Sequence, residues 1–191
     1  MSKNKVKFGL ENVHVAKINE EAGEITYGTP TPIKGAVSLT ADAEGESTPF
    51  YADNIKYYIA VSNQGYTGEL TLAMTPDEFL KDIMGQEQDD NGALIENAND
   101  INARFALMGE IKGDIRNRRF VYYDCTAARP SQSYNTIEES KTPETDSISL
   151  TMSPRNSDNA IKAVIELNDN NGEAYNNFFK SVYEKKAVVG V

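Results

Sequence analysis

The stretch from Gly35 to Met74 constrains the fold more than any other part of the sequence. It contains β-rich runs joined by an acidic segment and a short Asn-Gln-Gly turn. Two predicted strands each carry apolar residues on one face, namely Val37, Leu39 and Ala41, then Ile55, Tyr57 and Ile59. Residues 42–53 between these strands are predicted to be a loop, and they are far more numerous than a hairpin turn needs. We therefore expect this loop to reach a partner rather than merely to connect strands.

The length and charge of the chain limit what it can do. Its 191 residues suit a single domain with its own core, and 39% hydrophobic content is ordinary for a folded protein. The net charge is -10 and the pI is near 4.7. Sequence-independent binding of nucleic acid needs many cations, so this balance argues against a protein that grips DNA or RNA. It does not argue against a protein past which DNA slides.

Single cysteine and histidine residues exclude several classes of site. Cys125 stands alone, so an intramolecular disulfide is impossible, and its strand-like surroundings favour a core position over a nucleophile. His14 is the only histidine, which excludes zinc sites built on histidine pairs and most Ser-His or Cys-His nucleophile arrangements. No apolar run is long enough to span a membrane, and no signal-type segment follows the start, so we expect a protein without an export address.

The sequence matches the known calcium-binding and phosphate-binding motifs poorly. Glu87, Asp89 and Asn91 have the spacing of calcium ligands, but the closing position holds Ala98 where a bidentate carboxylate is wanted. The segment around Gly109 and Gly113 lacks the length and the Lys-Ser/Thr ending of a phosphate-binding loop. We expect no metal and no cofactor.

The remaining segments predict a mainly β protein. A first hairpin pairs residues 13–18 with 25–27, a second pairs 105–109 with 120–124, and further strands cover 147–152 and 160–167. The fold class predicted from about eight or nine strands is a β-sandwich or partly open barrel with one or two short α-helices.

Two short helices are predicted. Thr75, Pro76 and Glu78 have the spacing of a capping box, and Gly85 gives a stop, which predicts a helix over 76–84. Apolar residues at helical spacing predict a second helix over 173–183. Both apolar stripes are typical of packing on a sheet.

Two exposed regions are candidates for contacts with another subunit. One is the predicted loop 42–53, and the other is the basic tip of the second hairpin, which also contains Lys112. The tip can equally be an ordinary solvated turn. The candidate contact residues are Glu44, Glu46, Thr48, Phe50, Tyr51, Arg116, Arg118 and Arg119.

Four segments together resemble the major tail protein of long-tailed, siphovirus-type bacteriophages. They are KVKFGLENVHVAKI near the start, the long run IKGAVSLTADAEGESTPFYADNIKYYIAVSNQGYTGELTLAMTPDEF, DCTAARPS, and NNFFKSVY near the end. The resemblance runs through most of the chain in the same order. It rests on the whole text, because none of these segments is a catalytic motif.

The resemblance implies a tail tube subunit that is not an enzyme. Such subunits are expected to form hexameric rings that stack into a tube, with residues 35–41 and 54–61 as inner-sheet strands and the loop 42–53 reaching a neighbour. The arms at residues 1–9 and 185–191 are further candidates for contacts. The implied partners are other copies of the chain, a tape measure protein, terminator and initiator proteins, and double-stranded DNA that passes through the lumen. The implied location is the virion, after synthesis in the host cytoplasm.

Two other readings stay open at this point. One is a β-sandwich binding or decoration module, for example a carbohydrate-binding one, although the absence of tryptophan disfavours a sugar platform. The other is a hydrolase, which the single histidine and the missing motifs disfavour.

Overall fold

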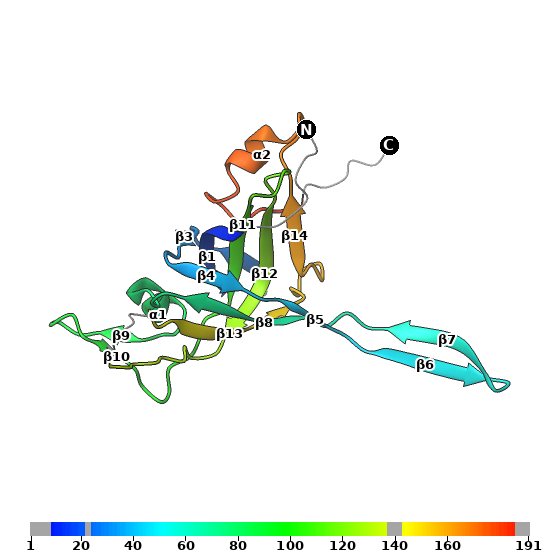
Figure 1. Ribbon diagram of the computed structural model, residues 1–191, viewed down its shortest axis with the longest axis horizontal. Coiled ribbons are helices and arrows are strands. Elements are labelled where there is room, and N and C mark those ends of the chain that lie inside the picture. The colour runs from blue at the N-terminus through cyan, green and yellow to red at the C-terminus, as the bar shows by residue number, and fades with distance from the viewer. Residues whose placement is uncertain (1–8, 22–23, 137–142, 186–191) are drawn as a thin grey trace.

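The computed structural model describes residues 9–21, 24–136 and 143–185 (Figure 1). The predicted arms at residues 1–9 and 185–191 therefore lie outside the described residues, except for Gly9 and Lys185. The main sheet has ten strands. They are β1 (Gly9–Glu21), β2 (Glu24–Tyr27), β3 (Thr31–Pro32), β4 (Ala36–Leu39), β5 (Asp42–Glu44), β8 (Gly65–Leu72), β11 (Phe105–Lys112), β12 (Arg119–Ala127), β13 (Asp146–Ser153) and β14 (Lys162–Ile165).

Two strand pairs and two helices complete the chain. The pairs are β6 (Ser47–Ala52) with β7 (Ile55–Val61), and β9 (Glu87–Gln88) with β10 (Leu94–Ile95). The helices are α1 (Asp77–Asp82) and α2 (Gly172–Asn176). The prediction of a mainly β fold, a β-sandwich or partly open barrel with one or two short helices, is confirmed, and the sheets are open.

Strand β12 joins two layers of the main sheet. The sheet runs in the order β2-β1-β11-β12-β13-β8-β4, with β3, β14 and β5 pairing β1, β12 and β8 respectively. The first half of β12 pairs with β14, whereas its second half, from Asp124 to Ala127, pairs with β13. One layer is thus β14, β12, β11 and β1, and the other is β13, β8, β4 and β5.

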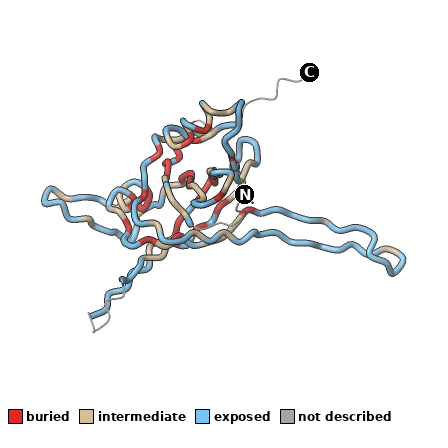
Figure 2. Tube along the Cα trace, turned by 45° about the horizontal axis from the view of Figure 1, so that its top comes forward, coloured by how far each residue is buried: buried red, intermediate tan, exposed pale blue. Residues whose placement is uncertain are grey.

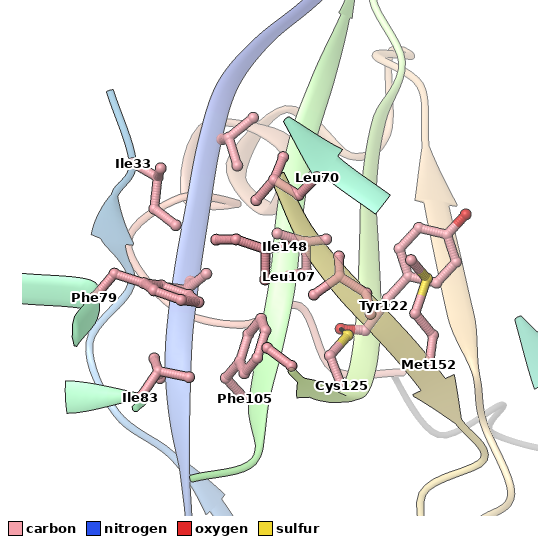
Figure 3. Packing of buried hydrophobic residues seen from close by; sticks show 14 of the residues in the cluster. Ile33, Leu70, Phe79, Ile83, Phe105, Leu107, Tyr122, Cys125, Ile148 and Met152 are labelled. Atoms are coloured by element: carbon pink, nitrogen blue, oxygen red, sulfur yellow. Dashed lines mark hydrogen bonds between the residues drawn. The ribbon is translucent and has the colours of Figure 1, made fainter. Parts of the chain in front are cut away.

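The main core lies between these two layers. It contains Phe105 and Leu107 from β11, Ile148 and Met152 from β13, and Leu70 from β8, all of them buried (Figure 3). Helix α1 closes one end of this core. The predicted core position of Cys125 is confirmed, because it is fully buried in this cluster.

The opposite face of β1, β11 and β12 is also covered. Ala106 and Met108, which alternate with Phe105 and Leu107 along β11, pack in a second cluster with Phe178 from the segment after α2. The hairpin β11–β12 is therefore buried on both faces, as a strand between two layers must be. The three layers are the β13–β8 sheet, the β11–β12 sheet and the α2 region (Figure 1).

Both helices are shorter than predicted. Thr75 does not cap α1: its backbone N–H and its hydroxyl donate to Asp146 Oδ2 at 2.7 and 2.8 Å, and Pro76 holds the N-cap position without a side-chain bond. The predicted capping box is thus wrong because the hydroxyl has a tertiary partner. Helix α2 ends at Asn176 instead of continuing to 183, and turns then carry Phe178 and Val182 to the core. Asparagine is a weak helix former.

The predicted loop 42–53 is wrong. These residues form β5 and β6, and the predicted inner-sheet strand 54–61 is β7, which pairs with β6 outside the main sheet. The other predicted inner strand, 35–41, does lie in the main sheet, as β4. The physical reason is that a polar, glycine-containing stretch followed by apolar residues can form a long ribbon as readily as a loop.

Arg155 fastens the end of the described chain to the body. Its side chain is 6% exposed, donates to Asp158 at 2.7 and 2.9 Å and to Glu184 at 2.8 Å, and lies over the Tyr123 ring. The guanidinium of Arg155 lowers the pKa of Asp158 to about 2. This network holds Glu184, close to the C-terminal end of the described residues, against β12.

Candidate assembly surface

A β-ribbon formed by residues 45–64, here called the arm, projects from the body (Figures 1 and 2). It continues the pairing of β5 with β8: Gln64 N–H donates to Glu44 O at 2.9 Å, and Ser62 N–H donates to Glu46 O at 2.9 Å. Beyond this root, β6 and β7 pair with each other alone. The arm is thus an outward extension of one sheet edge.

The tip of the arm is a two-residue turn. Ala52 pairs with Ile55, and the residues between them, Asp53 and Asn54, have φ values of 50° and 61°. Positive φ at both positions is typical of the turn type that matches the twist of a hairpin, and Asp and Asn tolerate it. This Asp-Asn pair is the sequence signal that could have located the arm.

A bulge redistributes the side chains of β7. Phe50 pairs with Tyr58 but Tyr51 pairs with Lys56, so Tyr57 is the extra residue. Consequently Ile55 shares a face with Tyr58, and Ile59 lies on the opposite face. The predicted common face of Ile55, Tyr57 and Ile59 is therefore wrong, because the bulge breaks the alternation.

Both faces of the arm expose apolar side chains. Figure 2 shows that nearly all of the arm is exposed. Seven large hydrophobic side chains of the arm are between 43% and 77% exposed. They are Phe50, Tyr51, Ile55, Tyr57, Tyr58, Ile59 and Val61. An exposed apolar surface of this kind is typical of an interaction site.

Five of the candidate contact residues lie on this ribbon or at its root. Glu44 ends β5, Glu46 is at the root, and Thr48, Phe50 and Tyr51 belong to β6. All five are exposed. The sequence reasoning missed Ile55, Tyr57, Tyr58 and Ile59 as surface residues, because it assigned them to an inner sheet.

The other three candidates lie at the β11–β12 turn and have partners within the chain. Arg116 pairs with Glu166 at 3.3 Å, and Arg118 pairs with Asp114 and lowers the pKa of that carboxyl. Arg119 is 17% exposed, bonds Glu110 and stacks on Tyr175 at 3.8 Å. Among the described residues, no hydrogen bond or ion pair joins this turn to the arm. Arg119 thus fastens α2 to the sheet.

The outer face of the β13–β8–β4–β5 layer is built from hydroxyls and carboxylates. Cross-strand pairs form three rows on this face, Ser38–Thr71–Ser147, Thr40–Glu69–Ser149 and Asp42–Thr67–Thr151. The Ser147 hydroxyl donates to Glu69 Oε1 at 3.2 Å, and the Glu69 N–H donates to Thr40 Oγ1 at 3.0 Å. The three rows contain seven hydroxyls, two carboxylates and no cation.

The calcium-like segment is a structural turn. The Asp89 carboxylate accepts backbone N–H bonds from Asn91 at 2.9 Å and Ala93 at 2.8 Å, and the Ala93 bond is the main cause of the lowered pKa of Asp89. Within residues 9–21, 24–136 and 143–185, no group of three His, Cys, Asp or Glu side chains could hold a metal ion. None of the described helices is long and apolar enough to cross a membrane.

Three solved structures are similar to this chain at low sequence identity. The fold is similar to the solved structure of the sheath-tube complex of the PVC extracellular contractile injection system (10% identity, TM-score 0.48, 82% of this chain and 89% of that chain). It is also similar to the tube-terminating cap of the anti-feeding prophage (9%, 0.46, 85% and 94%) and to Hcp1 from Flavobacterium johnsoniae (8%, 0.37, 82% and 97%).

The family comparison covers most of the sequence. No curated protein sequence matches the chain. A family model described as phage tail tube protein matches residues 1–165. This match, over far more than half of the chain, agrees with the resemblance in the sequence and with the mainly β fold. The chain belongs to the phage tail tube protein family, and its role is that of a structural component of the tail tube.

Proposed function

We propose that copies of this chain assemble into hexameric rings, that the rings stack into the tail tube, and that the arm is the main clasp between copies. The observation that carries the proposal is the arm, with apolar side chains exposed on both faces. The role is structural and requires no catalysis, metal or cofactor. It is exercised in the virion, after synthesis in the host cytoplasm.

The arm gains little stability from packing against the described rest of its own chain. A two-stranded hairpin is marginally stable alone in water, and neither face of this one packs on the body within the described part of the chain. Each Å² of apolar surface that a neighbour covers contributes about 25 cal/mol, so covering several aromatic and aliphatic side chains supplies a large driving force. The association should therefore be strongest where the arm is enclosed.

Open strand edges support ring formation. Among the described residues, β4 pairs only with β8, and β14 pairs only with β12. Such edges can pair with a neighbouring chain, and closing a ring removes them. Because the arm and the edges are different patches, the contact is head-to-tail, which can close around a ring or repeat along an axis.

The hydroxyl and carboxylate face is proposed to line the lumen. Glu69 and Asp42 give it a negative charge, and no lysine or arginine occurs in its three rows. Such a surface repels phosphate and offers no counterion, so double-stranded DNA can pass without being held. The remaining proposed partners are a tape measure protein inside the tube and terminator and initiator proteins at its ends.

The direct test is to remove the arm and keep its root. In the test variant an Asn-Gly turn replaces residues 47–61, so that Glu46 and Ser62, which are hydrogen-bonded, close a short hairpin. We expect the variant to be folded by circular dichroism, with a thermal midpoint close to that of the wild type. We expect no tubes in negative-stain micrographs.

A control changes an exposed apolar residue away from the arm. Ile101, between β10 and β11, is 86% exposed, and replacing it by serine should leave tube formation unchanged. Tubes of normal length from the armless variant would contradict the proposed clasp. A wild-type protein that stays monomeric at high concentration, with no tubes in infected lysates, would contradict the tube function itself.

A further inference from the structure

A groove opens where the two layers of the sandwich splay apart. Its volume is about 570 Å³, with β4 and the residues after it as one wall and β12 and β14 as the floor. The apolar lining residues are Leu10, Val37, Leu39, Ala41, Ile111, Phe120 and Val164. Val37 and Val164 are 56% and 49% exposed, although both belong to the main sheet. The groove is therefore a partly apolar continuation of the core that the described residues leave uncovered.

The rim of this groove can form backbone hydrogen bonds. It is bordered by the outer edges of β4 and β14, each of which pairs on one side only among the described residues. An extended segment laid between them could add to either edge as a further strand while its side chains enter the groove. A strand or a β-ribbon fits such a site better than a helix does.

The charges of the groove have the opposite sign to most of the chain. Its charged lining residues are Lys162 and Arg118, of which Arg118 is already paired with Asp114, while the whole chain carries -10. The Lys162 ammonium donates to the Tyr122 hydroxyl at 3.1 Å and lies 5.6 Å from the Tyr66 ring centroid. In the part of the chain that the structure describes, Lys162 forms no ion pair with a carboxylate. An acidic, apolar strand is the complementary ligand.

The arm has the properties that this groove requires. It is extended, apolar on both faces and unpaired along its outer edges in the described residues. Its carboxylates are Glu46 at the root and Asp53 at the tip, and its one cation is Lys56. The arm runs away from the body, so it does not enter the groove of its own chain (Figures 1 and 2).

We propose that the groove between β4 and β14 receives the arm of a second copy of this chain. The inference rests on the proposed function, since it takes the arm to be a clasp, and it adds the site at which the clasp is received. Donor and acceptor are different surfaces of one chain, so every copy can receive one arm and give another. The competing occupant is the segment 1–8, which directly precedes Gly9 at the groove.

The first experiment separates the groove from the arm. Val164→Asp places a carboxylate in the groove at a half-exposed position, so we expect a folded protein that forms no tubes. Mixed with the armless variant, it should form a one-to-one heterodimer by native mass spectrometry, since one partner keeps the arm and the other keeps the groove. The armless variant mixed with itself should stay monomeric.

The outcomes distinguish the two proposals. If Val164→Asp builds normal tubes while the armless variant does not, the groove proposal is overturned and the arm proposal stands. If both variants build tubes, both proposals are overturned. Absence of a heterodimer in the mixture, with both variants folded by circular dichroism, also overturns the groove proposal.

A second experiment identifies the occupant directly. A photoreactive benzoylphenylalanine at position 164, in tubes grown from a mixture of ¹⁵N-labelled and unlabelled protein, should cross-link to residues 47–61 of another copy. The same probe at position 101 should not. Cross-links from position 164 to residues 1–8, to any other segment, or to none in assembled tubes, would overturn the proposal.

Discussion

Two hairpins of this chain have similar patterns of apolar residues, but one is buried and the other is exposed. In β11–β12, successive residues such as Leu107 and Met108 are apolar and point to opposite faces, and both faces are buried. In β6–β7, Phe50 and Tyr51 are likewise apolar on opposite faces, yet they are 61% and 62% exposed. The first hairpin lies between two layers of its own chain, whereas the second lies outside every layer that the described residues form.

The comparison shows what a pattern of apolar residues on both faces requires. Such a strand needs a cover on each side, and the chain supplies both covers for β11–β12, namely the β13–β8 layer and the α2 region. The residues that the structure describes supply none for β6–β7. We infer that the missing covers belong to neighbouring copies, so that the tube completes a fold that the single chain leaves open.

The largest expected difference in stability between the two hairpins comes from one matched pair of substitutions. Phe105→Ala, in the core, should lower the free energy of unfolding by about 3–5 kcal/mol, because it leaves a cavity in close-packed surroundings. Phe50→Ala, in the arm, should change it by less than about 0.5 kcal/mol in the monomer. Urea denaturation followed by circular dichroism measures both.

When tube assembly is measured instead of stability, the substitution in the arm should have a large effect. Phe50→Ala should slow or abolish tube growth under conditions in which the wild type assembles, as measured by light scattering and electron microscopy. A large loss of monomer stability in Phe50→Ala would show that the arm packs on its own body, which would remove the contrast between the hairpins.

The attachment of the chain end to β12 gives the next effect. Arg155→Met removes charge-assisted hydrogen bonds from a buried guanidinium to Asp158 and Glu184, so we expect a loss of about 1–3 kcal/mol. The control is Arg116→Met, since Arg116 is 63% exposed and its pair with Glu166 should contribute at most about 1 kcal/mol. Equal effects in urea titrations would mean that Arg155 is not a fastening point.

Acid should weaken the same attachment. Because the folded-state pKa of Asp158 is lowered to about 2, its contribution is present above the ordinary aspartate range near 4 and is lost as pH falls through about 2. Asp158→Asn should therefore flatten the pH dependence of stability between these values. Thermal melts at a series of pH values would show this, and an unchanged slope would contradict it.

The smallest expected effect is on thiol labelling, which compares a cysteine in the core with one in the arm. Cys125 is fully buried and burial raises the pKa of its thiol, so the native protein should resist labelling until it unfolds. A cysteine introduced by Tyr58→Cys should react within the mixing time in the monomer and become protected in the tube. Rapid labelling of Cys125 in the native monomer would show that the core opens locally.

The body was predictable because its signals are local. The alternation of Ile148, Leu150 and Met152 with Ser147, Ser149 and Thr151 predicts a half-buried strand, and β13 is one. The pairing of 105–109 with 120–124 is likewise confirmed in β11–β12. The missing helix cap could not be predicted, since the partner of Thr75 is Asp146, 71 residues away.

The arm was only half predictable, for a physical reason. Alternation shows that side chains point to two faces, but it does not show which cover those faces meet, so β7 was assigned to an inner sheet. Glu44, Glu46, Thr48, Phe50 and Tyr51 were identified as an outreaching segment, and their role as contacts stays a prediction. Contacts between residues distant in sequence were a second difficulty. Arg119 is an example, because its partner Tyr175 is 56 residues away.

Hydrogen exchange of the arm before and after assembly tests the central claim most directly. In the monomer, amides of residues 47–61 should exchange quickly, while those of β11–β12 should be protected to the level of global unfolding. In tubes, the arm should become protected and β11–β12 should change little. If the arm is already protected in the monomer, or stays unprotected in tubes, then neighbouring copies do not provide its missing cover.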